Sequence, residues 1–191
     1  MISESLSFIS TEINKFLNQK LGVTTDPRLV LGSIVKATEG ETTLGNKIIL
    51  SLINVEEDKV AKTRENYTKT ESSVIYKNPP VFVNIYILIA ANMTQYADSL
   101  KMVALVMQFF QSQNYFTPLT HPGLDNRIEQ INVDLFTLNF EQINHIWSTL
   151  GGKYLPSVMY KVRQLAVEDE NAEEVEGKLI ESITTETSSM N

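Results

Sequence analysis

The sequence contains no cysteine and only two histidines, and its apolar runs are short. Without cysteine it has neither a disulfide framework nor thiolate chemistry, which fits a reducing cytoplasm. The start of the chain, Met1 to Ser5, lacks the basic segment of a signal peptide. The longest apolar run, Val81 to Ala91, is interrupted by Asn84 and is too short to span a bilayer. We therefore expect a cytoplasmic protein without direct membrane insertion.

Patterns for catalysis and cofactor binding are also missing. His121 and His145 do not have the HExxH spacing of a zinc site. His121 precedes a proline in a loop, and His145 falls on the polar side of a short helix. We therefore expect both histidines at the surface. Residues 151–153 resemble the end of a phosphate-binding loop, but Trp147 stands where its first glycine belongs and Tyr154 where it needs Ser or Thr. The sequence predicts no enzyme, no metal and no cofactor.

The net charge of −7 is concentrated at one end. Residues 168–191 hold eight acidic residues and one basic residue, whereas residues 1–167 hold 15 of each sign. A neutral body lacks the basic surface that nucleic-acid binding requires, so we expect no nucleic-acid partner. The tail is too polar to offset its ordering entropy by burial. We predict one domain over residues 1–167 and an acidic, flexible tail over residues 168–191; the alternative is a tail that orders on a partner.

Two stretches have the apolar spacing of long helices. The first covers residues 2–21 and ends at Gly22. The second covers residues 95–111, with Thr94 as its cap. Its apolar stripe, which should lie against a sheet, consists of Tyr96, Leu100, Val103, Met107 and Phe110.

Several stretches have the composition of strands. Residues 28–36 and 47–55 are rich in Val, Ile and Leu, and the polar turn 39–46 joins them. Residues 81–90 are apolar on both alternating faces, as in a central strand covered on both sides. Residues 131–136 alternate as well. The pattern predicts a single α+β domain with a mainly antiparallel sheet flanked by helices.

A helix, a stop and a strand follow one another near the end of the domain. Asn139 and Gln142 form a capping box for a helix over residues 140–150, with Trp147 as a core anchor. Two glycines, Gly151-Gly152, end that helix, and residues 158–163 alternate as a last strand.

Four stretches together resemble the cap, or tail-terminator, proteins of contractile injection systems, which are phage-tail-like particles. The first two are Leu50–Asp58 and Asn78–Asn92, the latter followed by Tyr96 and Leu100. The third is Gln108–Gln111 with Tyr115–Thr117, and the fourth is Phe140–Arg163. Within the fourth stretch, Trp147-Ser-x-Leu-Gly151 precedes Leu155-Pro-Ser157 and Tyr160-Lys-Val-Arg163. The resemblance covers about residues 45 to 165.

The resemblance implies a phage tail-terminator-like fold and a structural role. Proteins similar to this chain form a hexameric ring that closes the distal end of the sheath and inner tube, so these proteins are the expected partners. The particle is assembled in the cytoplasm and is then released or membrane-anchored. Two alternatives remain open: an assembly chaperone or adaptor of such a particle, and a small-ligand-binding or enzymatic α+β domain with dispersed site residues.

The polar segment 56–78 and the last strand are the expected contact regions. A loop of this length inside a domain is uncommon and is usually functional or mobile. It is open whether the segment is a solvated loop, an interface loop or a long hairpin in which residues 74–76 extend a strand. An exposed last strand would be a natural edge for another chain, and the acidic tail should matter less. The candidate interface residues are Lys62, Arg64, Tyr67, Lys69, Met159, Lys161 and Arg163.

Overall fold

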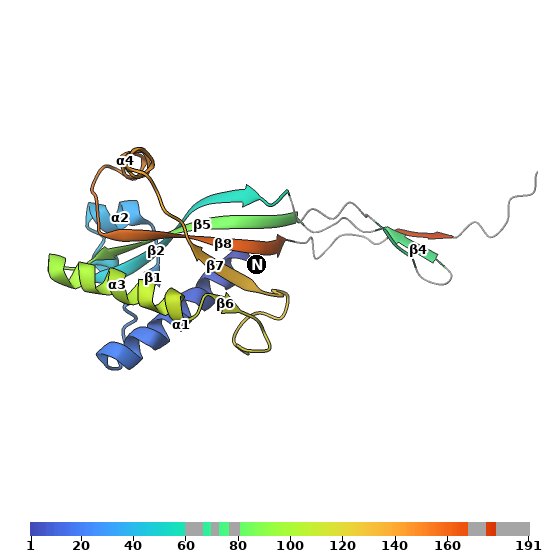
Figure 1. Cartoon of the computed structure of the whole chain (residues 1–191), viewed down its shortest axis with the longest axis horizontal. Helices are drawn as coiled ribbons and strands as arrows, with labels where there is room; N and C mark the ends of the chain where they lie inside the picture. Colours follow the sequence, from blue (N-terminus) through green and yellow to red (C-terminus); the bar gives the residue numbers. More distant parts are fainter. Residues whose placement is uncertain (60–66, 70–72, 77–80, 168–174, 179–191) are drawn as a thin grey trace, which may run out of the picture.

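A computed structural model describes residues 1–59, 67–69, 73–76, 81–167 and 175–178 (Figure 1). Its main element is a six-stranded sheet. The strands lie in the order β1 (Leu29–Leu31), β2 (Lys47–Glu57), β5 (Val81–Asn92), β8 (Ser157–Val167), β7 (Ile131–Leu135) and β6 (Tyr115–Phe116). Within the described residues, β1 and β2 pair in parallel and the other neighbours pair antiparallel.

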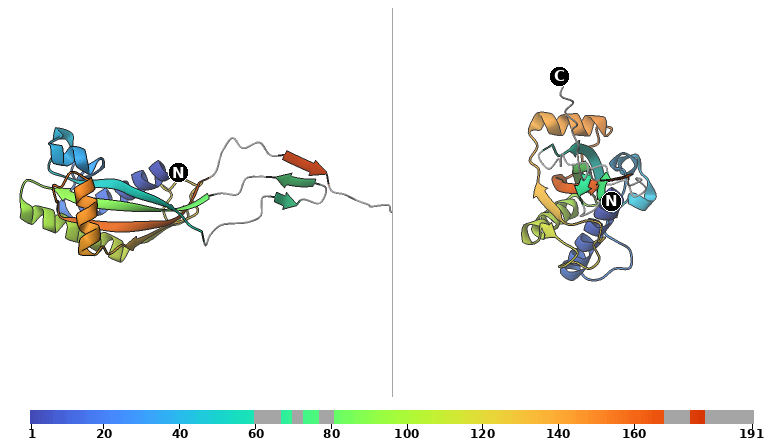
Figure 2. Two further views of the ribbon diagram at one scale, coloured as in Figure 1. Left: turned by 90° about the horizontal axis from the view of Figure 1, so that it is seen from above. Right: turned by 90° about the vertical axis from the view of Figure 1, so that its right-hand side faces the viewer.

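Helices cover both faces of this sheet. On one face lie α1 (Ile2–Leu21) and α3 (Tyr96–Ser112), and on the other lie α2 (Ile34–Glu39) and α4 (Phe140–Thr149). The end-on view in Figure 2 shows α4 on one side of the sheet and α1 with α3 on the other. The predicted α+β class, with a mainly antiparallel sheet flanked by helices, is confirmed. Gly22 ends α1 at the predicted place, with a φ of 89°.

The prediction that residues 81–90 form a central strand is confirmed. Strand β5 lies between β2 and β8 and pairs with both along most of its length. Ile85 and Ile87 are buried in the core under α1 and α3, while Leu88 and Ala90 are buried in the core on the α2 and α4 side. A strand with a hydrophobic layer on each face needs apolar residues at every position, which is why this segment does not alternate.

A cluster of aromatic rings lies in the core under α1 and α3. Phe109 contacts Phe110, Phe116 and Phe16 with ring centroids 5.0, 6.2 and 5.6 Å apart. Phe110 reaches the ring of Tyr160 on β8 at 4.4 Å, and burial raises the pKa of the Tyr160 hydroxyl to about 12. Phe109 and Phe110 are therefore core anchors, and their contacts join α3 firmly to the sheet.

The chain between residues 28 and 46 differs from its prediction. Only Leu29–Leu31 forms a strand, because α2 begins at Ile34, and the 3-10 helix η1 (Thr42–Leu44) follows it. The chain therefore returns to the sheet through helical turns, and β1 runs parallel to β2.

The outer edge of β1 is closed by a side chain of α1. The amide of Asn14 donates to the Leu29 carbonyl at 2.7 Å, and its Oδ1 accepts the Leu29 N–H at 2.9 Å. This pair of bonds occupies backbone groups that would otherwise be open to another strand.

Helix α3 packs a different flank from the one predicted. It starts at Tyr96 with Gln95 rather than Thr94 at the N-cap, and no side chain caps it. Its buried residues are Ser99, Val106, Phe109 and Phe110. Of the predicted stripe, Phe110 is buried, Val103 is half-buried, and Tyr96, Leu100 and Met107 are exposed. The helix is apolar on two adjacent flanks, and its sequence does not determine which flank the sheet takes.

Helix α4 begins and ends as predicted. The backbone N–H of Gln142 donates to Asn139 Oδ1 at 2.8 Å, and the Asn139 N–H donates to Gln142 Oε1 at 3.0 Å, which completes the capping box. Gly151 and Gly152 follow the helix with φ of 92° and 74°, a conformation that glycine adopts without strain. Trp147 is buried in the core on the α4 side, which confirms it as an anchor.

A second, smaller sheet joins the polar segment to the tail. Its strands are β3 (Tyr67–Lys69), β4 (Ser73–Tyr76) and β9 (Val175–Lys178), with β4 in the middle and both pairs antiparallel. Figure 1 shows this sheet beyond the end of the main sheet. The hairpin alternative for the polar segment is confirmed at β3 and β4. Residues 175–178 of the acidic tail form β9, whose backbone groups pair with those of β4.

Candidate assembly interface

The sheet face under α4 changes from apolar to charged along its length. Met159, Lys161 and Arg163 follow one another on this face of β8, while Val158, Tyr160 and Val162 belong to the core on the opposite face. This alternation confirms the predicted division of the last strand. Because α4 packs over the end with Met159, the end with Lys161 and Arg163 is left as a polar surface.

Charged side chains on this surface form two ion pairs. The Tyr86 hydroxyl donates to Glu56 Oε2 at 2.6 Å, and Lys161 Nζ lies 3.5 Å from the same oxygen. The hydrogen bond from Tyr86 and the charge of Lys161 lower the pKa of the Glu56 carboxyl. The second pair joins β8 to β7, with Arg163 Nε 2.6 Å from Asp134 Oδ2. Each pair bridges two strands, so the polar end of the sheet is held by cross-strand contacts.

The charged groups line a hollow of about 660 Å³ where β2 and β8 end and β5 begins. Its walls are Glu56, Glu57, Asp58, Lys59, Asn84, Lys161 and Arg163. Asn84 donates from its amide nitrogen to Asp58 Oδ2 at 3.3 Å, which gives the polar residue inside β5 a partner. Among the described residues no group of three His, Cys, Asp or Glu side chains could hold a metal ion. Paired charges in an open hollow are suited to polar contact with another molecule.

The structure places five of the seven predicted interface residues, in three groups. Lys161 and Arg163 are accessible and lie together on the charged face. Met159 is 5% exposed, packed beneath α4, so its prediction as a surface contact is wrong for the isolated chain. Tyr67 and Lys69 lie in β3 of the small sheet, and Lys62 and Arg64 lie outside the described residues.

The prediction that the last strand forms an exposed edge is also wrong. Strand β8 lies inside the main sheet, between β5 and β7. Its residues Val158 to Val162 are paired with β5, and Tyr160 to Arg163 are paired with β7. A strand late in the sequence can still occupy a central position, because sheet order depends on contacts that local sequence does not encode.

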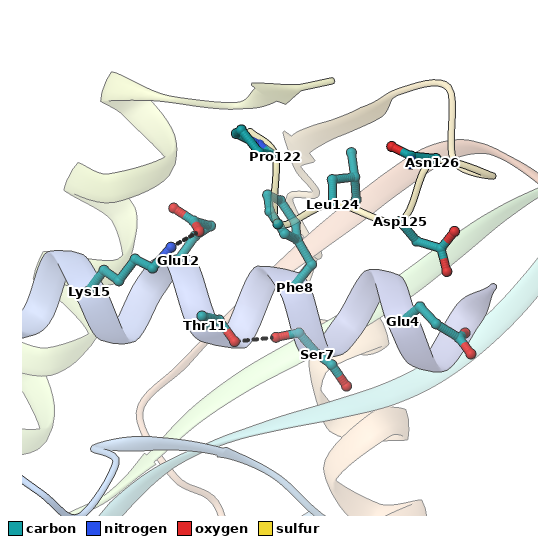
Figure 3. A pocket seen from close by; sticks show the side chains of 11 residues that line it. Glu4, Ser7, Phe8, Thr11, Glu12, Lys15, Pro122, Leu124, Asp125 and Asn126 are labelled. Carbon is teal, nitrogen blue, oxygen red and sulfur yellow. Dashed lines mark hydrogen bonds and ion pairs between the residues drawn. The ribbon is translucent and has the colours of Figure 1, made fainter. Parts of the chain in front are cut away.

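A hollow beside α1 carries no unusual chemistry. Figure 3 shows this space of about 600 Å³, which lies between α1 and the loop after β6. Three carboxylates line it, and each is already paired. Glu4 pairs with the chain's amino group, Glu12 with Lys15 at 2.6 Å, and Asp125 with Arg127 at 2.7 Å. The hydrogen bonds from Arg127 lower the pKa of the Asp125 carboxyl to about 2. The charges here stabilise the loop geometry.

The two histidines have different environments. His145 is exposed on α4, as predicted. His121 is not a simple surface residue, because its ring meets those of Phe8 and Phe116 edge-on at 5.9 and 5.1 Å. Its ring nitrogens also contact Thr120 and Gln113 at 2.9 Å. His121 therefore packs the loop against α1.

The sequence model of the Pvc16 N-terminal domain family matches residues 8–180. The chain belongs to this family. The match extends through β9, so the small sheet lies within the matched region. A comparison with curated proteins finds no match.

Two solved structures share the fold of this Pvc16 N-terminal domain. One is the PVC sheath/tube terminator in its extended state, from an extracellular contractile injection system, with 12% identity and a TM-score of 0.55. The alignment covers 95% of the present chain and 64% of that one. The other is the tube-terminating cap of the anti-feeding prophage, with 16% identity and a TM-score of 0.59 over 94% and 60% of the two chains. The present chain thus spans somewhat less than two thirds of either.

These comparisons confirm the predicted tail-terminator resemblance and the fold class. At identities of 12% and 16% they establish the architecture of this Pvc16 N-terminal domain and not the contacts of individual residues. Within the described part of the chain, no helix combines the length and apolar character needed to cross a membrane.

Proposed function

We propose that the chain is a structural cap subunit that ends the sheath and inner tube of a contractile injection particle. The observation that carries this proposal is the family match over residues 8–180, joined to a fold shared with two sheath or tube terminators. In this proposal the subunit has no catalytic role and needs no cofactor. Its partners are further copies of itself and the sheath and tube proteins of a particle assembled in the cytoplasm.

A closed ring, with six subunits, is the proposed form of the cap. A cyclic ring requires two different surface patches on each subunit, which meet head to tail and close by rotation. Small contacts that recur around a ring add up to strong attachment, because each bound subunit raises the effective concentration of the next contact. A surface of paired charges and short strands can therefore hold a cap on a tube.

The charged sheet face and the small sheet are the proposed contacts to sheath and tube. Both lie at the same end of the molecule, where β2 and β8 end and β5 begins (Figures 1 and 2). Lys161 and Arg163 supply the charged part of this surface. The remaining proposed contacts are Lys62, Arg64, Tyr67 and Lys69 on the polar segment.

The cap proposal is tested by imaging particles made with and without this chain. We expect the chain at one end of purified particles, and tails of irregular length when it is absent. An assembly chaperone would act on particles but would not remain on finished ones. Finished tails of normal length without the chain would contradict the proposal.

Two deletions test the contact surface. One removes residues 61–73 and the other ends the chain at Val167. Both remove part of the small sheet and leave the main sheet intact, so we expect folded protein and weakened capping. Gln19→Ala, an exposed change in the last turn of α1, serves as the control and should cap normally. If particles made with both deletions combined still had tails of uniform length, the contacts would have to lie on the body of the domain.

A further inference from the structure

Helix α3 has an apolar flank that its own chain leaves uncovered. Tyr96, Leu100 and Met107 are 65%, 49% and 43% exposed, whereas Val106 and Phe110 on the adjacent flank are buried. At about 100° per residue, the three exposed side chains fall within an arc of about 40°. We call this line of side chains the α3 stripe. A continuous apolar line on an exposed helix face marks a contact site more often than scattered apolar residues do.

The α3 stripe continues into an apolar hollow beside α4. Met107 borders this space of about 280 Å³, together with Leu135, Trp147 and Tyr154. Leu135 and Tyr154 are themselves more than half exposed. The rings of Trp147 and Tyr154 meet edge-on with centroids 5.3 Å apart, so the wall of the hollow is a packed surface. The apolar area therefore extends from α3 across the end of β7 to α4.

A second apolar patch lies at the β1–β2 edge of the sheet, on the face that also carries α1 and α3. Leu31, Leu52 and Val55 are each between 41% and 44% exposed, and we call them the β2-edge patch. Leu31 pairs with Leu50, which places Leu52 next to it on the same face, and Val55 stands opposite Ile85. Pairing between β1 and β2 ends at Leu50, so among the described residues no strand pairs with the outer edge of β2 at Leu52 and Val55.

We propose, building on the cap function proposed above, that the α3 stripe of one copy packs on the β2-edge patch of the next copy. The two patches lie near opposite edges of the sheet, because the strand order places β1 and β2 at one edge and β7, which the α3 stripe approaches at Met107, near the other. One subunit can use both patches at the same time. The contact is heterologous and propagates from copy to copy, as a closed ring requires. A contact of two α3 stripes with each other would stop at a dimer.

Cysteine cross-linking tests this pairing without background, because the chain has no cysteine of its own. Met107→Cys and Leu52→Cys are prepared as separate full-length proteins and mixed under mild oxidation. We expect a disulfide-linked dimer in the mixture and not in either protein alone. Lys101→Cys, exposed on another side of the same helix, replaces Met107→Cys as the matched control and should not link.

A charge in the stripe provides the second measurement. Leu100→Asp, combined with Met107→Cys, should lower the yield of the cross-link about tenfold, which corresponds to about 1.4 kcal/mol. Since Leu100 is half exposed, the far-UV circular dichroism and the thermal midpoint should remain close to those of the parent protein.

Three outcomes would overturn the inference while leaving the cap function to its own test by imaging. The first is linkage of Met107→Cys with itself, which indicates paired stripes. The second is no link in the mixture, whether the parent protein forms a ring or not. The third is a Leu100→Asp variant that forms rings normally but is lost from particle ends, which shows that sheath or tube covers the stripe.

Discussion

Replacing Ile87 with alanine tests the assignment of β5 as the centre of the sheet. Ile87 is 0% exposed and pairs with Leu52 on β2 and Tyr160 on β8. The change removes three carbons, or about 2.4 kcal/mol at roughly 0.8 kcal/mol per buried carbon. The cavity left between two strands and a helix layer adds to this, so we expect a loss of about 3–4 kcal/mol in the free energy of unfolding. For a chain of this size the thermal midpoint should fall by about 10 °C.

The measurement is urea unfolding followed by two signals. Trp147 is the single tryptophan and lies in the core on the α4 side, whereas Ile87 lies in the core under α1 and α3. Fluorescence and far-UV circular dichroism should shift together, because β5 belongs to both cores and couples them into one cooperative unit. Leu100→Ala, a half-exposed change on α3, should cost less than about 1 kcal/mol. A loss below about 1 kcal/mol for Ile87→Ala would refute the reasoning.

Two further predictions concern local features. Asn139→Ala removes the acceptor of the Gln142 N–H and should lower the stability of α4 by about 1 kcal/mol. The loss should be measurable as faster hydrogen exchange in the first turn of α4. Asn139→Asp keeps an acceptor at this position and should retain most of the protection. The pKa of the Asp125 carboxyl is lowered from 3.8 to about 2 by hydrogen bonds from Arg127, so its contribution to stability is present above about pH 4 and is lost as the pH falls toward 2. An NMR titration should place its midpoint near 2, and Arg127→Ala should return it toward 3.8; an unchanged midpoint in that variant would rule out Arg127 as the cause.

Features encoded by a few neighbouring residues were predictable from the sequence. The glycine end of α1, the capping box of α4 and the doubly apolar strand β5 each depend on side chains within one short segment. In each case a local physical cause, either backbone conformation, a hydrogen bond or burial on two faces, acts without help from distant residues.

Features that depend on distant partners were not predictable in the same way. Residues 28–36 carry Val, Ile and Leu throughout, yet the helix α2 begins at Ile34 because Ile34 and Ala37 pack into the α4-side core. The predicted apolar stripe of helix α3 has the spacing of a core face, but the sheet packs against the adjacent flank of the helix. The same holds for β8, whose central position results from pairing with β7. For the proposed interface, the alternation in the sequence predicted that Lys161 and Arg163 share one face of β8, as they do in the structure, but it did not predict that the α3 stripe is exposed.

The small sheet changes how the polar segment and the tail have to be considered. In the sequence they are separate, and the tail was expected to matter less than the loop. In the structure β4 lies between β3 and β9, with Tyr76 opposite both Tyr67 and Val175. Without β9 a two-stranded hairpin remains, which is marginally stable at best in water. Ending the chain at Val167 should therefore disturb the loop as well as remove the tail, so the two deletions should produce the same capping defect, and their combination should be no more severe than either alone.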